Sequence, residues 1–62
     1  MKYQGMTVNE RLYVSGLMDE FDKAVKEKDT QKVKSILENI EINEESIKPI
    51  LKELGLIEDV RS

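Results

Sequence analysis

The chain has 62 residues, a net charge of −3, and neither cysteine nor histidine. A chain of this length forms one domain, residues 1–62, with a small core, and the missing residue types exclude disulfide bonds and the usual metal sites. The isoelectric point of about 4.9 argues against a general nucleic-acid binder. No apolar run approaches the roughly 20 residues of a membrane span, and residues 1–5 do not resemble a signal peptide. We therefore expect a cytoplasmic protein that does not enter a membrane.

Residues 1–6 show no hydrophobic periodicity, and we expect this segment to be a flexible lead-in, as we do for residues 59–62. Organised structure is predicted to begin at Thr7, because Thr7 and Glu10 form the T-x-x-E pattern of a capping box. The helix that follows carries more apolar residues than one narrow stripe needs. They are Val8, Leu12, Tyr13, Val14, Leu17, Met18, Phe21, Ala24 and Val25.

Gly16 lies in the middle of this stretch and allows two interpretations. One helix of about 20 residues would tolerate it at a cost near 1 kcal/mol. Alternatively the helix ends there, because glycine followed by Leu17 suits a Schellman stop, and Asp19 caps a second helix that ends near Lys28. The same Gly-Leu pair recurs at residues 55–56. We favour the break.

Two later stretches repeat the spacing i, i+3, i+4, i+7, which places four side chains on one face of a helix. The two sets are Val33, Ile36, Leu37 and Ile40, and Ile47, Ile50, Leu51 and Leu54. The first of these helices is predicted to run from Thr30 to about Asn39, with a cap from Asp29.

The start of the last helix is ambiguous because of Pro49. Asn43 is a good N-cap, with Ile42 and Ile47 as a hydrophobic staple, but Pro49 then lies beyond the first turn, where it removes a hydrogen bond. A cap at Ser46 would place Pro49 at the third helical position, where proline is tolerated.

These elements predict an all-α domain, a small bundle of three to four short helices in which the last two form an antiparallel pair. The core is expected to contain the apolar residues at helical spacing. They are Leu12, Leu17, Phe21, Ala24, Val25, Val33, Ile36, Leu37, Ile40, Ile47, Ile50, Leu51 and Leu54.

Nothing in the chain indicates catalysis. Nucleophilic chemistry needs a positioned base, most often histidine, and there is none. The acidic cluster Asp19, Glu20 and Asp22 is interpreted as a complement to a helix dipole rather than a metal site. We expect no enzyme, no cofactor and no metal.

Five lysines make the middle of the chain locally basic and provide weak candidates for anion contact. They are Lys23, Lys26, Lys28, Lys32 and Lys34. Acidic residues alternate with them and no arginine or aromatic residue accompanies them, so a solvated helix surface is the favoured interpretation. The alternative is a small DNA-binding or antitoxin-like regulator that uses residues 23–34.

The segment Asn9-Glu10-Arg11-Leu12-Tyr13, followed by residues 16–17 and 19–22, resembles the opening of short uncharacterised bacterial proteins. The resemblance covers about the first third of the chain. It implies a bacterial cytoplasmic origin, and the group carries no assigned activity that could be transferred to particular residues.

Several apolar residues exceed what one helical stripe needs, and we interpret them as a candidate interface. They are Tyr13, Val14, Met18, Leu56, Ile57 and Val60. The sequence therefore favours a small non-catalytic protein-interaction module or regulatory subunit, with a protein partner or a homodimer as the simplest use of the surface.

Overall fold

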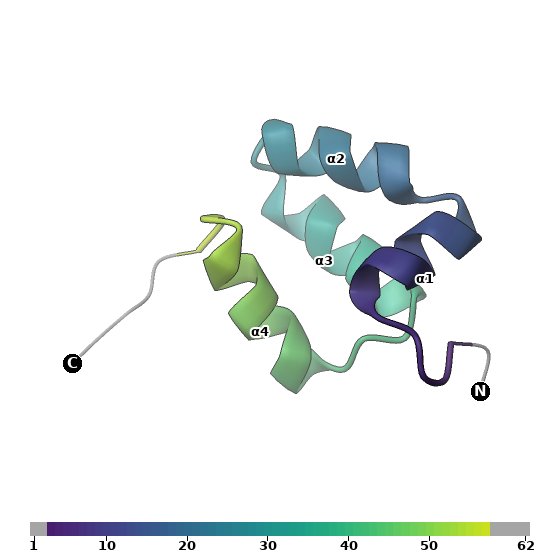
Figure 1. The fold of residues 1–62 in the computed structure, drawn as a ribbon. Coiled ribbons are helices and arrows are strands. Elements are labelled where there is room, and N and C mark those ends of the chain that lie inside the picture. Colours follow the sequence, from purple (N-terminus) through teal and green to yellow (C-terminus); the bar gives the residue numbers. More distant parts are fainter. Residues whose placement is uncertain (1–2, 58–62) are drawn as a thin grey trace.

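The computed structural model describes residues 3–57, and in that range the chain forms four short α-helices and no strand (Figure 1). The helices are α1 (Val8–Ser15), α2 (Met18–Lys26), α3 (Thr30–Asn39) and α4 (Glu44–Glu53). The predicted all-α bundle is confirmed. Expectations for residues 1–2 and 58–62, including Val60, lie outside the described part of the chain.

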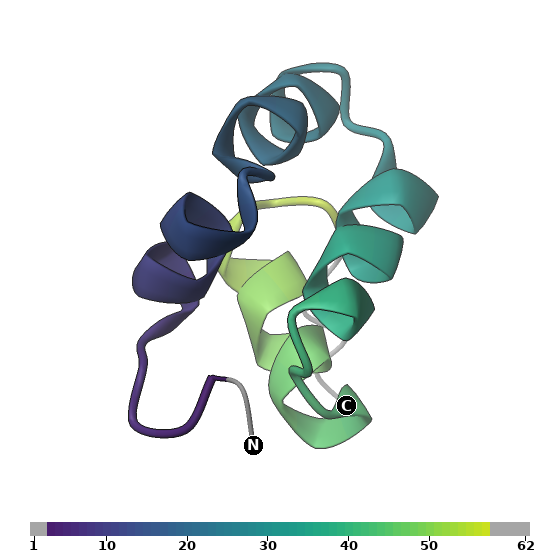
Figure 2. The same cartoon turned by 90° about the vertical axis from the view of Figure 1, so that its right-hand side faces the viewer.

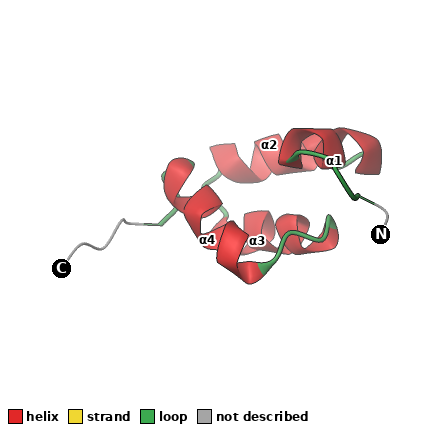
Figure 3. Ribbon diagram, turned by 60° about the horizontal axis from the view of Figure 1, so that its bottom comes forward, coloured by secondary structure: helices red, strands yellow, loops and turns green. Residues whose placement is uncertain are grey.

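The helices follow one another with a change of direction at each turn. Helix α2 packs against α1 and α3, and α3 packs against α4. Figure 2 shows α1 and α3 on opposite sides of the molecule, with α2 above them and α4 between them. Helices α3 and α4 run in opposite directions at an oblique crossing, and only short loops join the helices (Figures 2 and 3). The core lies where the apolar faces of these helices meet.

The core closely follows the predicted apolar faces, because helical spacing fixes which side chains share a face. The buried residues are Tyr3, Leu12, Phe21, Ala24, Val33, Ile36, Leu37, Ile40, Ile47 and Leu51. Leu17, Val25, Ile50 and Leu54, which were expected in the core, are half-buried and pack against its edge. So small a bundle has too little depth to cover the outer residues of each stripe.

Tyr3 is a core residue that the sequence did not indicate. Its side chain is 7% exposed and belongs to the buried cluster, although the six residues around it show no hydrophobic periodicity. Residues 3–6, here called the N-terminal turn, close on themselves through a hydrogen bond from the Met6 amide to the Tyr3 carbonyl, 3.1 Å. Gly5 has φ +79°, the conformation that a type II turn requires at its third position.

Helices α1 and α3 begin at the caps that the sequence predicts. Thr7 and Glu10 form a complete capping box, with Thr7 N–H donating to Glu10 Oε1 at 2.9 Å and Glu10 N–H donating to Thr7 Oγ1 at 3.2 Å. Asp29 accepts from Lys32 N–H at the start of α3. Each side chain satisfies one of the amides that a helix start leaves without a partner.

The expected cap at Asp19 is wrong. Helix α2 begins two residues earlier than a cap at Asp19 would allow: its N-cap is Leu17, and no side chain caps it. The break at Gly16 is so tight that Leu17 both ends α1 and begins α2. Asp19 lies instead within the first turn of α2, where its charge complements the helix dipole.

Asn43 is the N-cap of α4, which settles the ambiguity around Pro49. Asn43 Oδ1 accepts from Ser46 N–H at 2.9 Å, and Pro49 lies inside the helix. Proline has no amide hydrogen, so the carbonyl of Glu45, four residues earlier, lacks its helical partner. Glu45 is exposed, and water can take that partner's place.

All four helices end in the same arrangement. One residue directly beyond the last turn of each helix has a positive φ: Gly16, Lys28, Glu41 and Gly55 at +78°, +57°, +66° and +75°. Each ends its helix with the two reversed hydrogen bonds of a Schellman motif, as in Gly16 N–H to the Tyr13 carbonyl and Leu17 N–H to the Leu12 carbonyl, 3.2 and 3.0 Å. The predicted stops at Gly16 and Gly55 are confirmed.

Candidate functional site

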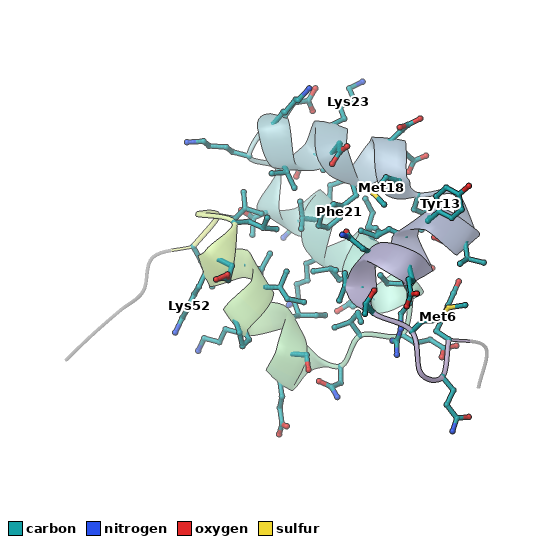
Figure 4. All side chains as sticks on the ribbon, in the orientation of Figure 1. Met6, Tyr13, Met18, Phe21, Lys23 and Lys52 are labelled. Atoms are coloured by element: carbon teal, nitrogen blue, oxygen red, sulfur yellow. The ribbon has the colours of Figure 1, made fainter. Side chains whose placement is uncertain are left out.

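An apolar groove beside α1 is the most distinctive surface in the described part of the chain. We call it the α1 groove, and its lining residues are Met6, Asn9, Glu10, Tyr13, Val14 and Met18. Four of these six side chains are apolar or aromatic. Figure 4 shows Tyr13 and Met6 on the α1 side of the molecule, with Met18 at the start of α2.

Tyr13 and Val14 are exposed because of their positions on α1. Successive residues of an α-helix are rotated by about 100°, so residues directly after the buried Leu12 turn away from the core. Tyr13 is 79% and Val14 58% exposed, and they are the large hydrophobic residues with the greatest exposure among residues 3–57. A solvated helix face ordinarily carries polar side chains, so this pair marks a surface suited to contact.

The groove has polar groups at its edge. Glu10 is engaged in the capping box with Thr7, which fixes its carboxylate at the start of α1. Asn9 is exposed beside it. An apolar groove with a few polar groups in its lining is typical of binding surfaces, because apolar area supplies affinity and polar groups orient the partner.

The N-terminal turn also contributes a residue to the groove lining. Met6 is half-buried, and its carbonyl accepts a hydrogen bond from Arg11 Nε at 3.2 Å. In a hydrophobic staple, an apolar residue four positions into the helix would contact Met6. Here that position is Arg11, and a hydrogen bond makes the link instead. The absence of the apolar pair explains why sequence reasoning missed Met6 as a groove residue.

The predicted interface residues separate into two places. Tyr13, Val14 and Met18 line the α1 groove together. Leu56 and Ile57 follow α4, at the side of the molecule away from α1, and are half-buried against the core (Figure 1). Only the first three therefore share one surface.

The lysines proposed for anion contact do not gather into a cationic surface. Lys23 and Lys32 line one shallow depression together with Glu20, Glu27 and Asp29, so carboxylates outnumber ammonium groups there. Lys23 extends outward from α2 in Figure 4.

Lys26 and Lys28 are exposed. Lys34 forms an ion pair with Glu44, 3.5 Å between Nζ and Oε2. A phosphate at this surface would meet alternating charge rather than a positive field.

A second groove lies between α3 and α4. Its floor is formed by Ile47 and Leu51, which are 2% and 6% exposed, and charged side chains surround it. The α1 groove is the stronger candidate because Tyr13 and Val14 remain open to solvent.

Within residues 3–57, no group of three or more acidic side chains is placed to hold a metal ion. In the same range, no helix combines the length and apolar character that crossing a membrane requires. Comparisons with models of protein families, with curated proteins and with solved structures find no match to this chain. The geometry of the α1 groove is therefore the main basis for a functional proposal.

Proposed function

We propose that this protein is a small non-catalytic interaction module, and that it binds a protein partner through the α1 groove. The observation that carries the proposal is the exposure of Tyr13, 79%, beside Val14, Met6 and Met18. Tyrosine and methionine suit contact surfaces: the first presents a large rigid ring with a polar end, and the second adapts its shape.

The chemistry of the groove indicates the kind of partner. Its apolar lining favours an apolar or aromatic side chain from the partner, and Asn9 and Glu10 at the edge offer acceptors for a backbone amide or a lysine. The net charge of −3 favours a partner surface that is neutral or basic around the contact.

The alternative, a DNA-binding regulator using residues 23–34, has less support. Lys23 and Lys32 lie beside three carboxylates, and Lys34 is paired with Glu44. A labelled DNA duplex at low salt tests it directly. We expect no binding at tens of micromolar protein, and binding that weakens steeply with salt would favour the regulator instead.

The proposal is tested by affinity capture with matched baits. The wild-type chain, the double variant Tyr13→Ser with Val14→Ser, and the control Lys23→Ser with Lys26→Ser are each used to capture proteins from the producing cells. We expect one partner to bind the wild type and the control and to be lost from the groove variant. Equal recovery on all three baits would contradict the proposal.

A second copy of the chain is one partner that can be tested without cells. Sedimentation at tens of micromolar distinguishes a 7.2 kDa monomer from a species of twice that mass. If the wild type dimerises, the groove variant should be monomeric. A monomer that persists at millimolar concentration would exclude self-association and leave a different protein as the partner.

A further inference from the structure

One side chain connects the N-terminal turn to the far end of α3. Arg11 Nη1 donates to the carbonyls of Ile40 and Glu41, at 3.1 and 3.2 Å, while its Nε donates to the Met6 carbonyl at 3.2 Å. The last carbonyls of a helix carry partial negative charge, which favours the guanidinium there.

Arg11 also contacts the turn through its aromatic residue. The guanidinium carbon lies 5.8 Å from the centre of the Tyr3 ring, within the range of a cation–π interaction. Arg11 therefore holds the N-terminal turn at both of its ends, by the ring of Tyr3 and the carbonyl of Met6. The planar guanidinium can bridge two sides in this way because its donors point in several fixed directions.

The turn that Arg11 holds also contributes a wall to the α1 groove. Met6 is the last residue of the turn, and it lines the groove with Tyr13 and Met18. The helices supply the remaining lining residues, whose positions depend on the packing of the bundle. The position of Met6 depends on the turn.

We infer that the N-terminal turn is a latch, with Arg11 as the positioning residue that keeps it closed. With Arg11 engaged, Met6 completes the α1 groove. With Arg11 released, the groove loses this wall while the four helices remain folded. The consequence for binding rests on the proposed function: a partner seated against Met6 would stabilise the closed turn, and closing the turn would raise the partner's affinity by the same factor.

The first test is Arg11→Lys. Lysine keeps the positive charge near the end of α3, but its single nitrogen cannot reach both Ile40 and Met6. Losing a charge-assisted hydrogen bond should speed amide exchange at Met6 about tenfold, and in every variant exchange at Met6 should be faster than exchange at Leu37 in α3, because the turn opens without unfolding α3. The methyl resonances of Met6 and Val14 should shift, and that of Val25 on α2 should not. Lys26→Met, which removes an exposed charge elsewhere, is the control and should leave all of these signals unchanged.

The second test reaches the turn without changing Arg11. Gly5 has φ +79°, and a side chain at this position would meet no atom within 4 Å, so Gly5→Ala adds backbone strain alone. We expect about fivefold faster exchange at the Met6 amide and methyl shifts in the same direction as in Arg11→Lys.

Two results would overturn the latch. One is unchanged exchange at Met6 in both variants. The other is wild-type exchange at Met6 that is as slow as exchange at Leu37, which would mean that the turn opens only when the whole domain unfolds. All of these measurements use the chain alone, so they remain decisive if no partner binds the α1 groove. Likewise, failure of the latch leaves the capture experiment with Tyr13 and Val14 unaffected.

Discussion

Arg11 on α1 donates a hydrogen bond to the carbonyl of Ile40 at the end of α3, 3.1 Å away and 29 residues later in the chain. Helices α1 and α3 lie on opposite sides of the bundle in Figure 2. This bond therefore joins α1 to the end of α3, two elements that are distant in sequence. It also satisfies a carbonyl that the end of α3 would otherwise leave without a helical partner.

Replacing Arg11 by methionine should lower the stability of the whole domain. The substitution keeps an unbranched side chain but leaves the carbonyls of Met6, Ile40 and Glu41 without their donor. We expect the free energy of unfolding to fall by about 1–3 kcal/mol, measured by urea denaturation. Unchanged stability would show that water replaces the guanidinium at no cost.

Gly16→Ala should destabilise the protein by about 1 kcal/mol or more, because Gly16 has φ +78° and an added Cβ is strained there. A thermal melt measures this change. The sign is informative: in a continuous helix the same substitution would stabilise the chain by about 0.5–1 kcal/mol. A higher melting temperature would therefore contradict the break between α1 and α2.

The opposite substitution should stabilise the two Schellman motifs that lack glycine. Lys28 and Glu41 have φ +57° and +66°, so glycine at either position relieves backbone strain. We expect Lys28→Gly and Glu41→Gly each to raise the free energy of unfolding by about 0.5–1 kcal/mol, after the entropy cost of glycine is included. Lys23→Gly, at an exposed position inside α2, is the control and should lower the free energy of unfolding by about 1 kcal/mol.

Leu37→Ala should lower the free energy of unfolding by about 2–5 kcal/mol, enough to unfold a domain of this size. Leu37 is fully buried at 0% exposure, so truncation removes apolar contacts and leaves a cavity. Val14→Ala is the comparison because Val14 is largely exposed, and its effect should stay within about 0.5 kcal/mol. If Leu37→Ala lowered the free energy of unfolding by less than about 0.5 kcal/mol, the face of α3 that carries Leu37 would lie outside the core.

Local signals in the sequence predicted most of the fold. The Thr7–Glu10 capping box, the Asp29 cap and the stops at Gly16 and Gly55 each depend on residues within one turn of one another. The stops at Lys28 and Glu41 carry no such signal, because neither residue type favours a positive φ. The predicted end of α2 near Lys28 was therefore approximate, and α2 ends at Lys26.

Long-range features could not be predicted in this way. Tyr3 is buried, and Arg11 bonds to Ile40, only because folding brings distant segments together. The hydrophobic periodicity of a sequence contains no information about such contacts. The residues of the α1 groove were predicted only in part. Tyr13, Val14 and Met18 were recognised as excess apolar residues, but Met6 joins them through the N-terminal turn, and Leu56 lies elsewhere.

The central claim is that protein partners contact the α1 groove, and site-specific photo-crosslinking in the producing cells tests it most directly. A photoreactive phenylalanine derivative replaces Tyr13 in one variant and Lys26, exposed on α2, in the control. We expect a discrete crosslinked adduct from position 13, none from position 26, and loss of the adduct when Met18→Ser alters the groove. Equal adducts from both positions, or none from position 13 at normal protein levels, would contradict the claim.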